Sequence, residues 1–246
     1  MIKRSKLILI LILLLFFLLN FAATYNRNKI QQENQPPVVK LSAPQNNSLF
    51  DWDTPITYKI TVSDKEDGES KYDEINVKEV LLEVKYIKGK LKTPAVTNKA
   101  VQNDAPGLAV IRSSNCFNCH NFNAKSIGPS FYDISKRYPA TLSNTDTLTK
   151  RIREGSSGLW VKEKMPSHPE LTNGEIKSTV QWILKNGTDP NVNYYTGTEG
   201  TIRIKQPANG QKGIYVLTAS YTDHGLKNDR SKNFKKGADV VVISKR

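Results

Sequence analysis

The two cysteines of this 246-residue chain stand three positions apart, in the run Cys116 to His120, which reads CFNCH. Side chains three positions apart lie on one side of a helical turn, so two thiols at this spacing can react with one flat ligand. A Cys-x-x-Cys-His run is the attachment motif of c-type haem. The motif therefore predicts one covalent haem c, held by thioethers to Cys116 and Cys119, with His120 as an iron ligand.

Zinc binding and dithiol redox chemistry are the alternatives for paired cysteines. A zinc site would need a second ligand pair at finger spacing, and the chain lacks one. A thioredoxin-like motif would need a βαβ context, which the flanking residues do not supply. The spacing therefore favours haem.

The chain carries 36 Lys and Arg residues against 23 Asp and Glu residues, a net charge of +13. Such an excess is typical of proteins that bind nucleic acid, an anionic membrane or an acidic protein. The positive charge is spread over the last two-thirds of the chain, without an arginine-rich run or a nucleic-acid motif. We expect a lysine-rich solvated surface, no nucleic-acid binding, and redox partners with an acidic docking surface.

The N-terminus has the layout of an export signal: three basic residues precede an almost unbroken apolar run from Leu7 to Ala23. This run is long for a signal core and short for a membrane span, and the residues around Ala22 form a poor cleavage site. We expect residues 1–24 to be an uncleaved membrane anchor and residues 25–37 to be a linker. The rest of the chain then lies in the periplasm or elsewhere outside the cytoplasm. A cleaved signal is the alternative.

Short runs that alternate apolar and polar residues predict strands on both sides of the cysteine motif. The runs are 38–41, 56–62 and 77–87 within residues 38–100, and 201–205, 213–221 and 238–244 within residues 191–246. Either set alone would form only half of a sandwich and leave an apolar face uncovered. We therefore predict one β-sandwich, split by a haem domain at residues 101–190 whose ends emerge close together.

The two β segments resemble immunoglobulin-like domains of the polycystic-kidney or cadherin-like type. The resemblance rests on four stretches: Pro36 to Val39, Val62 to Gly68, Gly213 to Asp223 and Val240 to Ile243. The acidic residues of the first segment can ligate calcium, since hard cations prefer clustered carboxylates. The residues are Asp64, Glu66, Asp67 and Asp73, and the usual preference of Asp for turns favours plain turn chemistry over calcium binding.

Residues 107–187 predict four helices. The first begins near Asp104 and Pro106 and ends in the cysteine motif. The second lies between residues 130 and 138, and the third surrounds residues 148–152. The last begins with a capping box at Thr172 to Glu175 and ends at Gly187.

A haem iron held by His120 needs a sixth ligand or an open site. Met165 is the only methionine apart from the initiator, and it lies in a loop before the last helix. A lone methionine usually fills a gap in a core, but His and Met are a usual ligand pair of cytochromes c. We predict Met165 as the ligand, with His168 as the alternative because imidazole binds iron readily. His224 falls in a turn of the sandwich, away from the iron.

Several stretches of the haem segment resemble the small bacterial class I cytochromes c. They are Ile127 to Phe131, Arg151 to Trp160, and Met165-Pro166 ahead of the last helix. The resemblance implies an all-α haem domain in which the Pro129 carbonyl accepts the N–H of His120. It also implies that Arg151 and Trp160 bind a haem propionate.

Three positions depart from the pattern of that family. Val161 stands where glycine is frequent, Lys164 where a proline commonly precedes the methionine, and His168 where a side chain can hydrogen-bond the methionine sulfur. Lys162 and Lys164 should place positive charge beside the exposed haem edge.

The sequence thus predicts an α+β multidomain chain: a class I cytochrome c domain inserted into a split immunoglobulin-like sandwich, behind an N-terminal hydrophobic helix. We expect a mono-haem c-type cytochrome that carries single electrons between exported or membrane redox partners, and not an enzyme. One alternative is the electron-accepting module of an exported sugar or alcohol dehydrogenase complex. Others are a haem-based ligand sensor with an open sixth site and a carbohydrate-binding or adhesive β module with an incidental haem.

Overall fold

The computed structural model describes residues 33–89, 104–160, 162–206, 213–227 and 233–246. Five strands precede the helices: β1 (Val38–Ala43), β2 (Leu49–Phe50), β3 (Pro55–Asp64), β4 (Gly68–Glu69) and β5 (Leu81–Lys88). The helices are α3 (Pro106–Ser113), α4 (Phe131–Arg137), α5 (Leu142–Glu154) and α6 (Asn173–Asn186). Four strands follow: β6 (Val192–Thr196), β7 (Glu199–Arg203), β8 (Gly213–Thr222) and β9 (Lys236–Lys245). Short 3₁₀ turns are η1 (Ser70–Tyr72), η2 (Val77–Glu79) and η3 (Cys116–Asn118).

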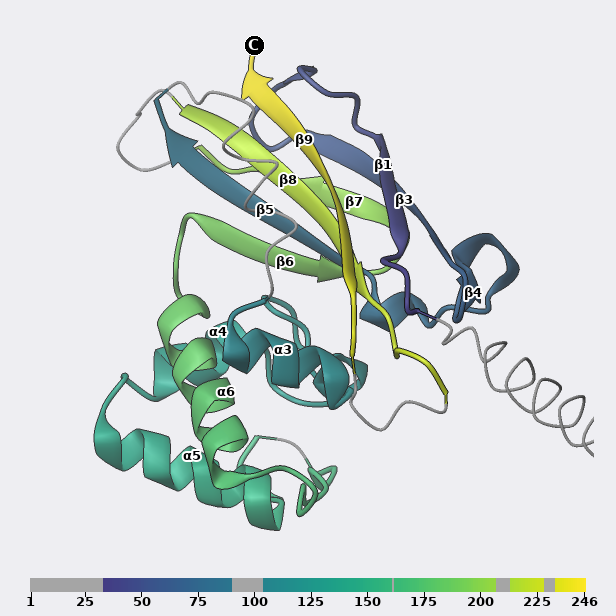
Figure 1. Ribbon diagram of the computed structural model, residues 1–246. Helices are drawn as coiled ribbons and strands as arrows, with labels where there is room; N and C mark the ends of the chain where they lie inside the picture. The colour runs from purple at the N-terminus through teal and green to yellow at the C-terminus, as the bar shows by residue number, and fades with distance from the viewer. Residues whose placement is uncertain (1–32, 90–103, 161, 207–212, 228–232) are drawn as a thin grey trace, which may run out of the picture. The chain divides into compact units, whose positions relative to one another are not determined.

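The strands form two sheets, and each sheet contains strands from both sides of the helices. One has the order β1-β3-β4 with β7 also paired to β3, and the other has the order β2-β9-β8-β5-β6. Strand β3 pairs with β7, with Ile56 opposite Ile202. Strand β5 pairs with β6, with Glu83 opposite Tyr194. Residues that flank the helical segment in sequence are therefore hydrogen-bonded neighbours (Figure 1).

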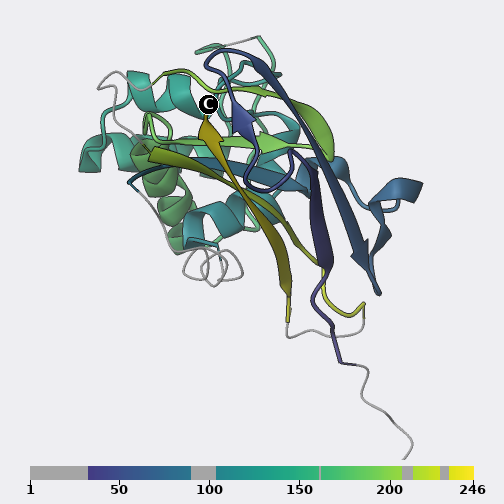
Figure 2. The same ribbon diagram turned by 90° about the horizontal axis from the view of Figure 1, so that it is seen from above.

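The two sheets share one hydrophobic core. In β3 every second residue from Tyr58 to Asp64 is buried, which is the period-two pattern of a strand with one covered face. Ile60 and Val62 of this strand belong to the same buried cluster as Leu82 and Leu217 of the other sheet. Seen from above, strands β1 and β3 form a layer separate from β8 and β9 (Figure 2). This β-rich region thus has two layers, while its immunoglobulin-like character and the predicted domain boundaries stay predictions.

The last helix forms where the sequence places it. The Thr172 side chain accepts a bond from the Glu175 backbone, and the Glu175 side chain accepts one from the Thr172 backbone, so the predicted capping box is confirmed. Gly187 is the C-cap, but its backbone is right-handed (φ −60°). A Cβ at Gly187 would collide with Ser135 of α4, so close helix packing rather than backbone handedness favours glycine there.

Two predicted helix bounds differ from the structure. The first helix does not run into the cysteine motif: α3 ends at Ser113, and Asn115 has a left-handed backbone (φ 56°) that interrupts the helix before η3. The third helix is longer than predicted, because Thr141 caps its start at residue 142. Thr145 is the only buried residue of α5, so its first two turns have no apolar repeat from which a helix could be predicted.

Two predicted β features also differ from the structure. Residues 77–79 form a 3₁₀ turn instead of the start of a strand, and Asn76 caps this turn with its side chain. Residues 192–196 lie outside the three runs predicted as strands within residues 191–246, but they form β6 at the edge of the second sheet. Val192 and Tyr194 are buried while Asn193 is not, so β6 follows the strand alternation over a length too short to stand out in sequence.

Aromatic side chains join the helices to the second sheet. Trp182 of α6 lies 5.3 Å from Tyr194 of β6, and Phe122 lies 4.9 Å from Tyr194, between ring centroids. Leu81 and Val192 belong to the same buried cluster. The helices and this sheet therefore bury part of their apolar surface against each other.

A buried arginine adds polar contacts at the same junction. Arg112 of α3 is 8 % exposed and donates to Asp104, Ser220 and the carbonyl of Glu79. Asp104 also accepts from Lys236 Nζ at 2.7 Å. The guanidinium thus has several acceptors, as a buried charge requires.

The predicted membrane anchor at residues 1–24 lies outside the described residues. Among the residues that the structure does describe, no helix combines the length and the apolar character needed to cross a bilayer.

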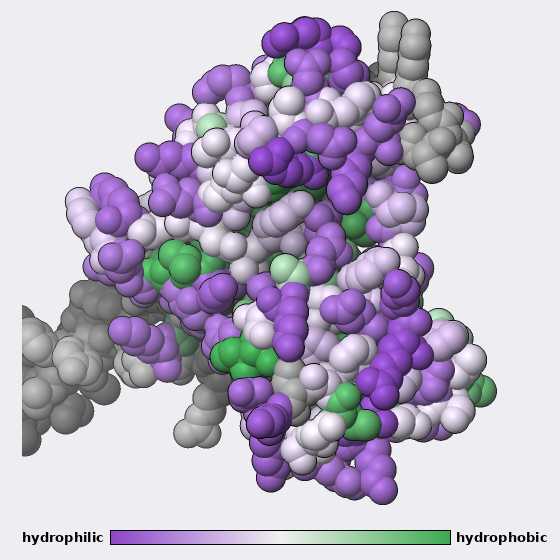
Figure 3. Space-filling model, turned by 180° about the vertical axis from the view of Figure 1, so that it is seen from behind, coloured by the Kyte–Doolittle hydropathy of each residue, from purple (hydrophilic) through white to green (hydrophobic). Residues whose placement is uncertain are grey.

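The face drawn in Figure 3 is mostly hydrophilic, with small separate hydrophobic patches.

The acidic residues considered for calcium make the contacts of turns. Asp64 accepts backbone bonds from Glu66 and Asp67 at 2.9 and 2.8 Å, and Asp73 caps η1 with a left-handed backbone. Within the described ranges, no group of three or more His, Cys, Asp or Glu side chains is arranged to hold a metal ion. Asp67 instead contacts the imidazole of His224 at 3.0 Å.

We predict that Arg112→Ala lowers the free energy of unfolding by about 3 kcal/mol, because it removes a buried charge from several acceptors and leaves them unpaired. Denaturant unfolding of the holoprotein measures this. Arg203→Ala is the matched control: Arg203 is exposed and donates to the Asp53 carbonyl, so its loss should change stability by about 0.5 kcal/mol or less. Equal effects of the two substitutions would contradict the assigned role of Arg112.

His224 should make the stability of the β-rich region depend on pH. Its contacts with Glu79 and Asp67 raise the pKa of His224 to about 9, from an ordinary value near 6.5. Because the pKa of His224 is higher in the folded state than in the unfolded state, protonation of this imidazole stabilises the fold fully below about pH 6.5. That contribution to the free energy of unfolding is lost as the pH rises from about 6.5 to about 9. Imidazole NMR titration should show the shifted midpoint, and His224→Gln should flatten the pH dependence. A His224 titration midpoint near pH 6.5 would contradict its contacts with Glu79 and Asp67.

Candidate functional site

A cavity open to solvent lies among the helices. It encloses about 1170 Å³, counting the space at its mouth, and its walls are mostly apolar. The cysteine motif, the Met165 loop and residues of α4, α5 and α6 all line it. Four of the sequence-predicted site residues therefore meet at one cavity: Cys116, Cys119, His120 and Met165.

The two thiols are brought together by a tight turn. In η3 the backbone N–H groups of Cys119 and His120 both donate to the Cys116 carbonyl, at 3.2 and 2.9 Å. Both thiols are free. Burial raises the pKa of Cys116 to about 11, so this thiol is protonated at neutral pH. A dithiol redox motif works through a lowered thiol pKa, and Cys116 shows the opposite.

The ring of His120 is fixed in position and in tautomer. Its Nδ1 lies 2.7 Å from the Pro129 carbonyl oxygen, the pair that the cytochrome resemblance names. A carbonyl only accepts, so Nδ1 carries the proton and Nε2 keeps its lone pair. Phe131 stacks on the His120 ring, with 5.7 Å between the ring centroids and an interplanar angle of 16°. Burial lowers the pKa of His120, which favours the neutral form that binds metal.

Gly128 allows the chain to pass close to this ring. A Cβ at Gly128 would stand 2.6 Å from Cε1 of His120, closer than carbon atoms approach one another. The Gly128 backbone N–H donates to the Cys119 carbonyl at 2.8 Å. The loop before α4 is thereby tied to the cysteine motif on the His120 side of the cavity.

Met165 is held by backbone bonds to the end of α5. Its N–H donates to the Ser156 carbonyl at 2.8 Å, and the Ser156 N–H donates to the Met165 carbonyl at 3.2 Å. Gly155 precedes this pair with a left-handed backbone (φ 78°) and little space for a Cβ, which would meet the Met165 carbonyl at 2.7 Å. These bonds hold the Met165 loop against the cavity.

Arg151 and Trp160 both line the cavity and both contact Tyr138. Arg151 Nη1 lies 2.6 Å from the Tyr138 hydroxyl, and the Trp160 and Tyr138 ring centroids are 6.5 Å apart. Arg137 adds a contact that the sequence analysis missed. Its guanidinium lies 4.7 Å from the Trp160 ring centroid, and it donates to the Leu159 carbonyl at 3.3 Å. No spacing pattern links Arg137 to Trp160 in the sequence.

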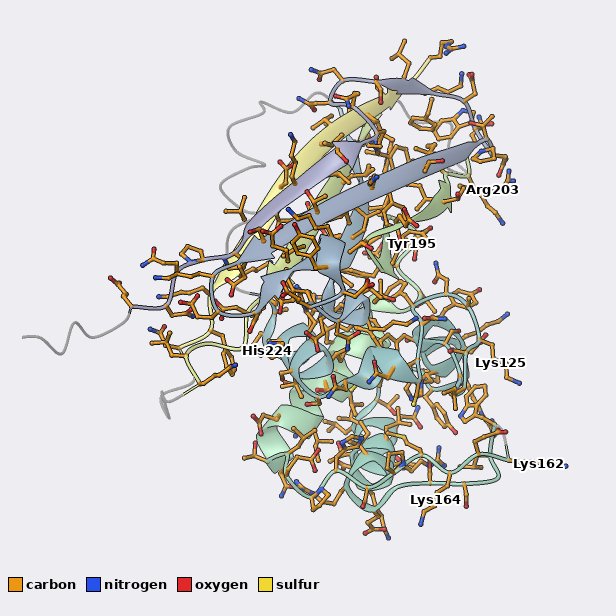
Figure 4. All side chains as sticks on the ribbon, turned by 90° about the vertical axis from the view of Figure 1, so that its right-hand side faces the viewer. Lys125, Lys162, Lys164, Tyr195, Arg203 and His224 are labelled. Carbon is orange, nitrogen blue, oxygen red and sulfur yellow. The ribbon has the colours of Figure 1, made fainter. Side chains whose placement is uncertain are left out.

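Three exposed lysines belong to the cavity lining or lie within two residues of it in the sequence. Lys164 lines the cavity, and Lys125, Lys162 and Lys164 are all exposed on the same side of the helices in Figure 4. Two exposed apolar residues, Ile127 and Leu159, also line the cavity. Val161, one of the three departures from the family pattern, lies outside the described residues. His224 is in the β-rich region and is not among the residues that line this cavity.

These residues fit a flat, apolar, covalently held cofactor. A neutral imidazole with a free Nε2 and a thioether line one cavity, and two thiols stand on the same turn as the imidazole. Soft thioether and imidazole donors are common ligands of haem iron. The mostly apolar walls would cover the faces of a porphyrin.

A profile of the family described as cytochrome c matches residues 105–187, which contain all four helices. Cytochrome c-552 of Hydrogenobacter thermophilus is 36 % identical over 30 % of this chain and 74 % of its own length. Cytochrome c-551 of Azotobacter vinelandii is 32 % identical over 32 % of this chain and 94 % of its own. The crystal structure of Nitrosomonas europaea cytochrome c552 matches 31 % of this chain and 95 % of that chain, at 30 % identity and a TM-score of 0.30.

We predict that Gly128→Ala lowers the free energy of unfolding of the holoprotein by about 1–3 kcal/mol, because the added methyl group must displace the His120 ring or its own loop. Denaturant titration followed by absorbance and by circular dichroism measures this. Gly174→Ala is the control: no atom stands within 4 Å of a Cβ there, and alanine suits a helix, so stability should stay equal or rise slightly. Full stability in Gly128→Ala would show that the ring is not held as described.

Proposed function

This chain belongs to the cytochrome c family, and on that premise we propose that it is a mono-haem carrier that passes single electrons between redox proteins outside the cytoplasm. Its cofactor is haem c, and Cys116 and Cys119 fit the attachment motif. One observation supports the proposal above all others. His120 and Met165, the expected ligand pair, line the same cavity.

Bound haem supplies an iron that gains and loses one electron reversibly. In this proposal the chain keeps both axial side chains in place through that cycle. The Pro129 carbonyl holds the ring of His120, and the Ser156 backbone holds the Met165 loop. Because both anchors are backbone groups with no ionisable atom, they do not depend on the charge of the site.

We assign Arg151 and Trp160 to the haem propionates. Both line the cavity. One N–H of the Arg151 guanidinium donates to the Tyr138 hydroxyl, and a guanidinium has further N–H donors for an anion. Arg137, over the Trp160 ring, is a positioning residue in this scheme. A cation on the ring face restricts its rotation.

The docking face of the proposed carrier is the cavity mouth. Of the residues that line the cavity, Ile127 is 53 % exposed, Leu159 is 42 % exposed, and Lys164 is exposed as well. An apolar centre with a cationic rim suits a short-lived complex with an acidic redox protein. The net charge of +13 favours the same class of partner.

Location is part of the proposal. Haem c domains of bacteria act outside the cytoplasm, and the apolar run from Leu7 to Ala23 follows three basic residues. We propose that this run delivers the chain across the cytoplasmic membrane and anchors it there. Carbonate washing of membranes tests the anchor: haem that stays with the pellet supports it, and release of all haem contradicts it.

The second candidate is the electron-accepting module of an exported sugar or alcohol dehydrogenase complex. The β-rich region favours it: β6 and β5 share a buried cluster with the helices, so the haem segment carries a firmly attached second surface. Purification of the haem band from native membranes separates the candidates. A co-purifying dehydrogenase supports the second, and a reductase or oxidase supports the first.

The carrier predicts a six-coordinate iron with methionine ligation. The purified holoprotein should show a methionine-to-iron charge-transfer band when oxidised, should bind little carbon monoxide when reduced at neutral pH, and should give reversible one-electron voltammetry. A ligand sensor predicts the reverse, since it needs an open sixth site. Rapid carbon monoxide binding without the charge-transfer band would therefore contradict the carrier.

Lys162 and Lys164 predict that the rate of electron transfer to an acidic partner depends on salt. Lys162→Glu together with Lys164→Glu should slow electron transfer to an acidic partner about tenfold at low ionic strength, and less at high ionic strength, because steering charges are screened by salt. The control, Lys40→Glu with Lys59→Glu, makes the same change in net charge at exposed positions of β1 and β3. Equal slowing by both pairs would place the effect in net charge rather than at the mouth.

A further inference from the structure

The cavity contains a second imidazole besides that of His120. His168 lines the cavity with His120 and Met165, and it follows Met165 by three residues in the chain. Its side chain is 18 % exposed, so most of the imidazole is inside the protein. Exposed histidines away from the cavity, such as His224 at 62 %, have no such placement.

The backbone holds both side chains to the same support. Met165 is paired with Ser156, and the His168 N–H donates to the Ile152 carbonyl at 3.1 Å. Residues 152–156 are the end of α5 and the residues that follow it directly. The short loop between Met165 and His168 is thus fixed at both ends by backbone hydrogen bonds.

Glu170 sets the tautomer of the His168 ring. Its Nδ1 lies 2.8 Å from Oε1 of Glu170, and a carboxylate only accepts hydrogen bonds. In the neutral ring the proton is therefore on Nδ1 and the lone pair on Nε2. A carboxylate behind an imidazole is a common support of metal-bound histidines, because it fixes the tautomer and strengthens the donor. The arrangement parallels that of His120 with the Pro129 carbonyl.

His120 and His168 are the two imidazoles of the cavity lining. Lys164 lines the cavity as well, but it is exposed, and an ammonium group must lose its proton before it can bind a metal.

On the basis of the proposed carrier function, we propose that His168 is a reserve axial ligand, which binds the haem iron through Nε2 when the thioether of Met165 is withdrawn. Methionine raises the reduction potential of a haem, and a second histidine in its place lowers it. His168 therefore gives the carrier a second, lower-potential state and keeps the iron closed to small ligands in both states.

Removal of the thioether tests the proposal. In ferric Met165→Ala holoprotein, electron paramagnetic resonance should show low-spin iron with two nitrogen ligands, whereas Met165→Ala with His168→Ala should be high-spin. Carbon monoxide should bind the reduced single variant at least about tenfold more weakly than the double variant, because His168 competes for the site. His168→Ala alone is the control, and it should keep the methionine charge-transfer band.

High-spin iron in Met165→Ala would overturn the proposal, and so would low-spin iron that persists in the double variant. Met165→Leu, which keeps the side-chain volume, gives the same comparison if the alanine variant does not fold. The methionine band of the wild type tests the carrier itself. A wild type with that band and a high-spin Met165→Ala would refute the reserve ligand while leaving the carrier in place.

Discussion

The hydrogen bond from His120 Nδ1 to the Pro129 carbonyl is the contact on which the site depends. At 2.7 Å it fixes the plane of the ring and leaves Nε2 as the donor atom. Gly128 lets the loop pass close to the ring, and Phe131 stacks on the ring. On the Met165 side, the paired backbone of Ser156 has the equivalent role. Each side of the cavity is therefore set by backbone geometry.

The β-rich region takes part in building the helical segment. Tyr194 of β6 packs on Trp182 and Phe122, and Trp182 in turn lies 6.4 Å from Phe131, the residue stacked on His120. A continuous set of aromatic rings thus links the second sheet to the imidazole. Apolar burial of this kind is worth roughly 25 cal/mol for each Å² removed from water, so the junction stabilises both partners.

Much of the site could be predicted because its chemistry fixes sequence spacing. Two thioethers to one ring require Cys116 and Cys119 on one turn, and the next residue is then beside the iron. The capping box of Thr172 and Glu175 could be predicted for the same reason, because its two reciprocal hydrogen bonds require residues three positions apart. Such local rules do not depend on the rest of the fold.

The contacts that escaped prediction join residues far apart in the chain. Arg112 was not singled out, although it is buried against Ser220, 108 positions later. Arg137 reaches Trp160 across a loop and a helix, with no shared repeat. Asn115 interrupts the first helix by its left-handed backbone, which a sequence pattern of apolar residues does not contain. Tertiary packing, and not local propensity, decides these positions.

The central claim is that one haem lies between His120 and Met165, and proton NMR of the reduced holoprotein with ¹³C-methyl methionine tests it most directly. The chain has two methionines, so the spectrum is simple. The account predicts that the Met165 methyl resonance is shifted far upfield by the porphyrin ring current, and that Met165→Leu removes it. A Met165 methyl at the ordinary position of a solvent-exposed methionine would contradict the account.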